Sequence, residues 1–473
     1  MKTADATNTG DTGILDYYRM RQRRRKRNAI IAAVTALVIV LGACAGVWWT
    51  VGGGSIIAAN LTKPAAQPAT EEANMSVTAF AYRSAPEFLA MESARDPNGN
   101  MNYSPASMWM ALSLTAQGAK GGTRSQLDEL LGTGSLAETD YQSLMSSING
   151  RYNSSRSQMS AANSLWVDDG ITMADGFRST VSRSFDAEVV SADFGDRDGV
   201  AERMGRWVSQ HTKGMLKPNV KVSEREIMSV INTVHADGRW QDPFDPSFTT
   251  DEPFHGADDE STVRMMHRGF DGMVWAHDTN DTWQRVTIPF DNGGALVVLL
   301  PADGHFDEIV GDAERLQWAL GTCADAPAGC VTDAAPGWGV SSEPRTVHVS
   351  MPVFTIDSMF SSYETIATLK SLGGTDAVDD AAADFSGMTA DESPDGSPSG
   401  AAGVGRLFIG TVMQGTRIEV NEHGARAAAF TKSGTDSAGA PADPVEFTVD
   451  RPFLYALTTP DGIPLFIGAV RNL

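Results

Sequence analysis

The sequence predicts an α+β fold, with helices early in the chain and strands late. Three observations support this class. Early segments carry helix caps and apolar residues at helical spacing, late segments are short apolar runs, and regular alternation of strand and helix is absent. With 473 residues, 42 % of them hydrophobic, the chain is long enough to bury a sizeable core.

Helix signals are clearest at Ser104 and Pro105. Serine is a favoured N-cap, proline is favoured at the first helical position, and an apolar run follows. Thr123 is expected to cap a second, short helix that ends before Gly132. Residues 197–213 repeat apolar side chains at helical spacing, so they predict a further helix.

Strand signals are short apolar or alternating runs bounded by turn residues. They cover 160–167, 229–240, Trp283–Pro289, Ala295–Leu300, Thr346–Ile356, Leu407–Val420, Val445–Val449, Phe453–Thr459 and Pro464–Arg471. Pro460, Asp461 and Gly462 predict a hairpin turn between the last two. Residues 323–342 and 390–403 look like polar insertions.

The N-terminal part predicts a membrane anchor. Residues 1–28 carry eight Lys or Arg against three acidic groups, which favours a cytoplasmic basic tail. Residues 29–51 are uncharged and mostly apolar, long enough to cross a hydrocarbon core of ~30 Å as a signal anchor. Residues 52–74 then have the composition of a linker, and the globular domain is expected at 75–473.

Two alternatives to an uncleaved anchor remain open. The segment also fits a cleaved signal peptide, which would give a secreted protein. The run ending at Cys44 resembles a lipoprotein box, in which that cysteine would be lipidated. All three possibilities place the domain outside the cytoplasm, where Cys323 and Cys330 form a disulfide or stay free thiols.

Charge and motif patterns exclude several functions. Residues 29–473 carry 29 basic and 56 acidic groups, which argues against nucleic acid as a partner because such binding needs Lys and Arg against phosphates. The eight His residues are scattered without metal-ligand spacing, and no nucleophile is paired with a base. We therefore expect neither an enzyme nor a metal or other cofactor.

The stretch 419–435 has an unusual two-residue periodicity. After Gly424, one alternate set is made of small side chains, Ala425, Ala427, Ala429 and Thr431, while the other set includes Arg426, Phe430 and Lys432. Successive side chains of a strand point to opposite faces. The segment would thus make a strand with one face of small groups, yet it continues into a Gly- and Pro-containing loop.

This stretch, Glu419-Val420-Asn421-Glu422-His423-Gly424-Ala425-Arg426-Ala427-Ala428-Ala429, resembles the hinge signature of serpins. Further family motifs follow in the same order along residues 75–473. They are Asn102–Ser107, Gly118–Thr123, Asn232 to Trp240 with Pro243-Phe244, Pro352–Phe354, Ala383–Gly387, Asp450–Leu454 and Leu465–Gly468. With the predicted anchor, the chain resembles a bacterial-type, membrane-anchored serpin.

The resemblance implies a serpin fold of three β-sheets and eight or nine helices, with an exposed reactive-centre loop at about 424–444. It implies a monomeric inhibitor whose partner is a serine protease. The protease cleaves the loop as a bait, and the loop then inserts into the central sheet and traps the acyl-enzyme. A non-inhibitory serpin that acts as a binding or carrier protein is the alternative.

The resemblance also assigns roles to single residues. The hinge comprises Glu422, Gly424, Ala425, Ala427, Ala428, Ala429 and Thr431. A cluster where the sheet opens comprises Ser104, Ser107, Asn232, Gln414 and Trp240. Gln414 stands where many members have histidine, but its amide both donates and accepts hydrogen bonds, so the cluster is expected to persist with a different pH response.

Counting from Gly424 places the bait bond between Ala438 and Gly439, whereas counting back from Pro452 gives Pro441. Ala438 would suit an elastase-like protease with a small pocket. Lys432 makes a trypsin-like target possible, although it lies near the hinge.

Overall fold

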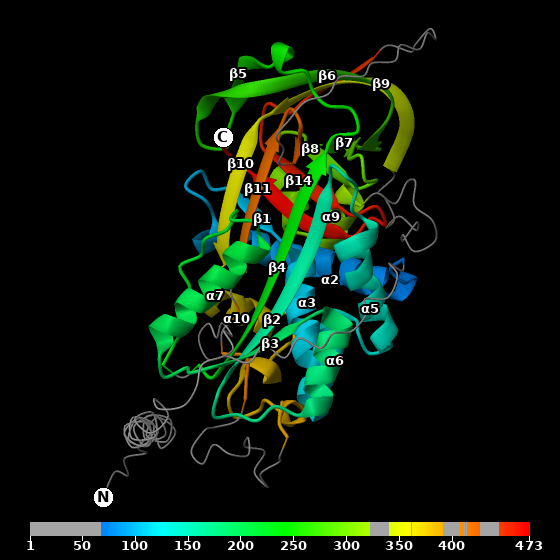
Figure 1. The fold of residues 1–473 in the computed structure, drawn as a ribbon. Coiled ribbons are helices and arrows are strands. Elements are labelled where there is room, and N and C mark those ends of the chain that lie inside the picture. The colour runs from blue at the N-terminus through cyan, green and yellow to red at the C-terminus, as the bar shows by residue number, and fades with distance from the viewer. Residues whose placement is uncertain are drawn as a thin grey trace, which may run out of the picture.

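The computed structural model describes residues 68–224, 226–321, 340–360, 362–390, 407–410, 412, 414–425 and 444–473. Over these ranges the chain is mixed α+β, as predicted, with nine α-helices and two hydrogen-bonded sheets (Figure 1). The helices are α2 Glu71–Leu89, α3 Pro105–Ala116, α4 Gly121–Leu131, α5 Glu138–Ser146, α6 Asp175–Phe185, α7 Arg197–His211, α8 Phe306–Val310, α9 Ala313–Leu320 and α10 Ser362–Ser371.

Two helix starts were predicted, and one is confirmed. Ser104 caps α3, since its Oγ accepts a hydrogen bond from the Ser107 N–H. Thr123 does not cap α4, which begins at Gly121. The Thr123 hydroxyl instead accepts a 2.9 Å hydrogen bond from the Asp384 N–H, a partner distant in sequence. The predicted end is correct, because Gly132 adopts the left-handed conformation, at φ +68°, that favours glycine.

The globular part starts before the predicted residue 75. Thr70 accepts a hydrogen bond from the Ala73 N–H and caps α2, so the last residues assigned to the linker are helical. The predicted anchor, residues 29–51, lies outside the described residues. Among the helices that the structure describes, none combines the length and apolar character needed to cross a membrane.

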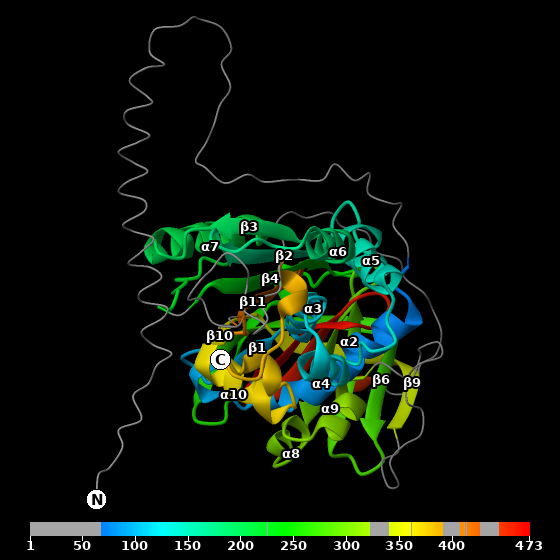
Figure 2. The ribbon, with the colours of Figure 1, turned by 90° about the horizontal axis from the view of Figure 1, so that it is seen from below.

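The six-stranded sheet has the order β10-β11-β12-β4-β2-β3. Its strands are β2 Gln158–Asp168, β3 Glu188–Ala192, β4 Met228–Arg239, β10 Phe354–Phe360, β11 Gln414–Asn421 and β12 Gly424–Ala425. All pairs are antiparallel except β2 with β3. Helix α7 covers one face of the sheet, where its Trp207 belongs to the same apolar cluster as Trp166 of β2, and α3 lies on the other face (Figure 2).

The second sheet has nine strands, in the order β1-β15-β14-β8-β7-β6-β9-β13 with β5 paired to β6. Its strands are β1 Met101–Tyr103, β5 Thr250–His255, β6 Glu260–Asp278, β7 Trp283–Pro289, β8 Ala295–Pro301, β9 Val340–Pro352, β13 Val445–Thr448, β14 Phe453–Thr458 and β15 Pro464–Val470. The predicted turn at 460–462 joins β14 to β15, with Gly462 at φ +82°. Helices α2 and α3 lie between the two sheets (Figure 2).

The resemblance implied three sheets, whereas the described strands join into two. The 19-residue β6 pairs with β5 at one end and β7 at the other, and it pairs with β9 over most of its length. A register shift between Phe270 and Met273 marks a bend in that pair. These long strands connect what would otherwise be two separate sheets.

Two predicted strands have different bounds. The run Thr346–Ile356 divides at Val353, whose N–H donates to the Arg264 carbonyl, so that β9 belongs to one sheet and β10 to the other. The run predicted from Leu407 becomes a strand only at Gln414. Strand patterns in sequence show which face is buried, but they do not show where a strand changes its partner.

Candidate functional site

Strand β12 occupies one end of a strand position between β11 and β4. Its two residues pair with the end of β11 on one side and with Gly238 and Arg239 of β4 on the other. Beyond Ala425, the described residues contribute no further strand between β11 and β4, although both strands continue (Figure 1). The chain thus enters this position at the end of the described segment 414–425.

Gly424 is required here by a close backbone approach. A Cβ atom at this position would lie 2.0 Å from the Gly238 carbonyl oxygen and 3.0 Å from the Arg239 Cα, and the backbone φ is +153°. No side chain fits at such distances without moving the main chain. The resemblance assigned Gly424 to the hinge, and the structure adds this steric reason for a glycine there.

The turn between β11 and β12 is held by Glu422. Its buried carboxylate accepts hydrogen bonds from Arg264 Nη2 at 2.7 Å and from the Thr249 hydroxyl at 3.0 Å. Its carbonyl accepts from the Phe244 N–H at 3.0 Å. A buried carboxylate needs such partners, so the turn is tied to both β6 and the segment after β4.

Trp240 braces the same turn. The buried indole Nε1–H donates to the Asn421 carbonyl at 2.9 Å, and the Trp240 N–H donates to the His423 carbonyl at 3.1 Å. The ring stacks on Phe290, with centroids 5.0 Å apart. Trp240 therefore contacts the hinge turn.

Ser104 and Gln414 form a reciprocal pair at the opposite end of β11. The Ser104 N–H donates to Gln414 Oε1 at 3.1 Å, and Gln414 Nε2 donates to the Ser104 carbonyl at 2.8 Å. The Ser104 hydroxyl also donates to the Leu465 carbonyl at 2.7 Å. The start of α3 is thereby attached to both sheets, across 310 residues of sequence in the case of Gln414.

A family model decides the identity. The model described as Serpin (serine protease inhibitor) matches residues 76–473. This chain belongs to the serpin family.

Several curated relatives align with most of this domain at low sequence identity. The leukocyte elastase inhibitor of Xenopus laevis is 25 % identical, covering 76 % of this chain and 89 % of its own length. A serine protease inhibitor of Cyanea capillata is 25 % identical over 79 % of this chain and 92 % of its own. Serpin-ZXA of Oryza sativa subsp. japonica is 28 % identical over 84 % and 96 %.

Solved structures share the fold. The native thermophilic serpin tengpin aligns at a TM-score of 0.71 with 22 % identity, covering 89 % of this chain and all of its own. Thyroxine-binding globulin in complex with thyroxine aligns at 0.65 with 20 % identity, over 84 % of this chain and 98 % of its own. Both likenesses concern the fold of this serpin.

In this serpin, the described hydrogen bonds do not join the residues predicted for one sheet-opening cluster into a single network. Ser104, Ser107 and Gln414 lie together, whereas Trp240 lies at the hinge turn. Asn232 donates instead to Asn163 Oδ1 on the neighbouring strand β2 at 2.7 Å. Asn232 also contacts Met110 of α3 and lines the same cavity as Gly415, so a shared role for these residues in sheet opening stays a prediction.

The sequence missed several polar partners of this site. Asn163 bridges Asn232 to the Phe185 carbonyl, to which it donates at 2.8 Å. Asn163 is a polar residue at a core-facing position of the predicted strand 160–167. A polar side chain at such a position was the sequence feature that could have indicated its role. Arg264 and Thr249, which hold Glu422, lie in a segment for which we predicted no element.

The remaining predicted hinge and bait residues, Ala427, Ala428, Ala429, Thr431, Ala438 and Gly439, lie outside the described residues. Cys44, Cys323 and Cys330 also lie outside them.

One group of acidic side chains within the described ranges has metal-like spacing. Oxygen atoms of Asp168, Asp169 and Asp193 lie within 4.8 Å of one another. The buried Asp168 carboxylate accepts hydrogen bonds from the Gly170 and Phe194 N–H groups at 2.9 and 3.2 Å. These contacts give Asp168 a structural role at the end of β2.

Replacing Gln414 tests how much the reciprocal pair stabilises the fold. Gln414→Ala leaves the buried N–H and carbonyl of Ser104 without these partners. We expect the free energy of unfolding to fall by about 2–4 kcal/mol in urea denaturation. Gln142→Ala is the matched control, since its amide bonds only to an exposed Glu138 side chain. A loss for Gln414→Ala as small as the control's would contradict the predicted role.

Proposed function

We propose that this serpin inhibits serine proteases by inserting its cleaved loop into the six-stranded sheet. The observation that carries the proposal is β12, which already occupies one end of a strand position between β4 and β11. A strand that has begun to pair on both sides needs only to extend. This is β-strand addition by a segment of the same chain.

The register of β12 predicts how the strand would extend. Ala425 pairs with Val420 of β11 and Gly238 of β4, so each further loop residue meets the preceding residue of both strands. Ala427 would then lie beside Ile418, and Ala429 beside Thr416. Both neighbours are buried, and paired residues share one face of a sheet. The small alternate set would thus enter the core, as insertion requires.

Loop cleavage would release a constraint at both ends. Ala425 is held in the six-stranded sheet, and Val445 is held in β13, parallel to β9 of the other sheet. Extending β12 to Thr435 would consume about 33 Å of chain, at roughly 3.3 Å per residue. Residues 436–444 would then span at most about 32 Å back to β13. Cutting the loop would remove this limit on the link back to β13.

The target class follows from the bait residue. Ala438–Gly439 presents a small side chain, which suits an elastase-like protease, and relatives from Xenopus laevis and Mus musculus are named leukocyte elastase inhibitors. A bait at Pro441 or recognition of Lys432 by a trypsin-like protease are the other possibilities.

The test is to incubate the full chain with elastase and with trypsin. We expect an SDS-stable covalent complex with elastase, because insertion traps the ester before water reaches it. The same chain, cleaved in its loop, is expected to resist heat better than the intact protein. Cleavage without a complex across a panel of serine proteases would reject inhibition and favour the binding or carrier alternative.

We further propose that the domain is extracellular and anchored by residues 29–51. The basic tail before this apolar segment supports the orientation. In cell fractionation, the full chain is expected in carbonate-washed membranes, with the loop open to protease added outside. Release into the medium would indicate a cleaved signal peptide. Loss of anchoring in Cys44→Ser would indicate a lipoprotein.

A further inference from the structure

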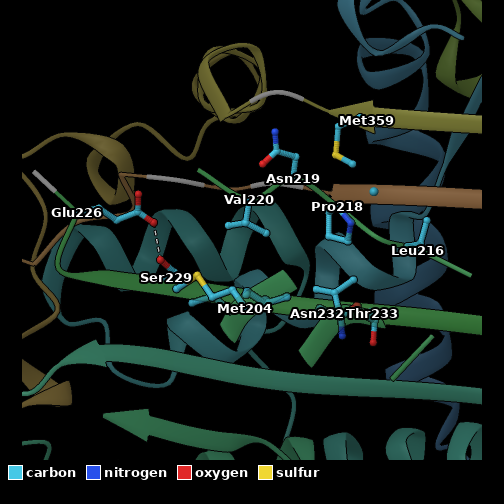
Figure 3. Close-up of a pocket in the computed structure, with 14 residues that line it drawn as sticks. Met204, Leu216, Pro218, Asn219, Val220, Glu226, Ser229, Asn232, Thr233 and Met359 are labelled. Carbon is cyan, nitrogen blue, oxygen red and sulfur yellow. Dashed lines mark hydrogen bonds between the residues drawn. The ribbon is translucent and has the colours of Figure 1, made fainter. Parts of the chain in front are cut away.

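A cavity of about 50 Å³ lies at the same strand position, farther along the sheet than β12 (Figure 3). Thr233 of β4 lines one side, and Gly415 of β11 and Met359 of β10 line the other. Met204 of α7 and Leu216, from the segment after α7, also line it. The cavity has room for about four water-sized spheres, which is the order of size of an aromatic ring.

The register of β12 predicts which loop residue would lie at this cavity after insertion. Ala425 pairs with Gly238 and Val420. If β12 were extended by five residues with the same pairing, position 430 would lie between Thr233 and Gly415. Both of these residues line the cavity. Position 430 is Phe430, the single aromatic residue between Gly424 and Val445.

The side of β11 that faces the cavity lacks a side chain at this point. A Cβ atom at Gly415 would lie 3.0 Å from Met359 Cε and 3.9 Å from Leu216 Cδ1. Gly415 is the one glycine of β11, and Met359 beside it is 45 % exposed, which is unusual for a large apolar side chain. An aromatic ring placed opposite a strand glycine covers the space that the glycine leaves.

Charge on the same outer face favours the same register. Arg417 contacts both Asp357 and Glu419 at 2.7 Å, so two carboxylates share one guanidinium. Extension by one residue brings Arg426 opposite Glu419, because Ala425 pairs with Val420. Arg426 would therefore supply a second positive charge, and a shift by one residue would move it to the apolar face.

We propose that Phe430 enters this cavity when the loop inserts, and that this contact speeds insertion and stabilises the inserted sheet. The inference rests on the proposed insertion mechanism and adds an anchor on the outer face to the small residues of the inner face. On insertion, the Phe430 ring would become buried against Met359 and Leu216. The missing side chain of Gly415 leaves the space for it.

The test compares the full chain and Phe430→Ala before and after loop cleavage, in detergent. We expect the intact forms to unfold at the same guanidinium concentration and the cleaved variant to unfold at a lower one than cleaved wild type. Insertion should also slow by roughly tenfold, the factor expected for an apolar side chain left partly exposed. The number of serpin molecules consumed per protease would rise accordingly.

A composition-matched variant locates the effect. Ala428→Phe combined with Phe430→Ala keeps the aromatic residue on the outer face but moves it two positions, opposite Arg417 and away from the cavity. We expect this variant to behave like Phe430→Ala. Gly415→Leu fills the cavity from the sheet, so by itself it should lower the resistance of the cleaved form. Combined with Phe430→Ala, the same substitution should restore that resistance.

The outcomes separate this inference from the proposed function. If cleaved wild type gains no resistance, insertion itself fails and the inference fails with it. If wild type gains resistance and Phe430→Ala gains as much, insertion stands and the role of Phe430 is rejected. A gain that appears only in oligomers, seen by gel filtration, would assign the strand position to the loop of a second copy and overturn the proposal.

Discussion

Ala427→Arg is expected to convert this serpin from an inhibitor into a substrate. If the loop inserts in the register set by β12, residue 427 would pair with the buried Ile418 of β11 and face the core. An unpaired arginine there would lose its hydration without gaining a partner. We expect insertion to slow by roughly 100-fold or more, since each ~1.4 kcal/mol is a factor of ten. Hydrolysis of the acyl-enzyme then outruns trapping, and gels should show cleaved serpin and active protease.

The matched control for Ala427→Arg places a charge on the other face. Ala428→Glu would lie opposite Arg417 on the outer side of the same strand, where a carboxylate meets a positive charge. It is expected to form the covalent complex nearly as well as wild type. Normal inhibition by Ala427→Arg, or equal failure of both variants, would show that the assignment of faces is wrong.

Gly424→Ala is expected to destabilise the intact protein. The added Cβ would lie 2.0 Å from the Gly238 carbonyl oxygen, and backbone atoms cannot move aside as a flexible side chain does. Overpacking of this kind costs about 1–3 kcal/mol, and more where main chain must shift. We expect a loss of about 3 kcal/mol or more in the free energy of unfolding, measured in urea. Amide exchange at Gly238 should rise as the β12 pairing is lost, whereas the Arg239 amide, which donates to the Ser157 hydroxyl at 2.8 Å, should change less.

Gly176→Ala in α6 is the control for Gly424→Ala. No atom lies within 4 Å of a Cβ built at Gly176, and alanine favours helix over glycine by up to about 1 kcal/mol. This variant should therefore be neutral or slightly more stable. If Gly424→Ala were as stable as Gly176→Ala, the close approach to Gly238 would not be what selects glycine at the hinge.

Local patterns in the sequence predicted the elements whose signals are local. The cap at Ser104, the end of α4 at Gly132 and the turn at 460–462 all lie where we expected them, because each depends on residues within one turn of chain. The α+β class is confirmed, and the order of motifs along residues 75–473 led to the family that the model match establishes. The two-residue periodicity after Gly424 indicates the two faces of a strand, and for residues 426–435 this stays a prediction.

The tertiary structure decided which of these elements meet. Glu422 is held by Arg264, 158 residues away, and Asn232 bonds to Asn163, although the sequence placed neither partner in the site. Periodicity fixes the face of a strand but not its neighbour, and hydrogen-bond partners so far apart leave no mark in a local pattern. For the same reason the sequence showed only that Phe430 is bulky. The register of β12 and the space beside Gly415 are needed to give that ring a place.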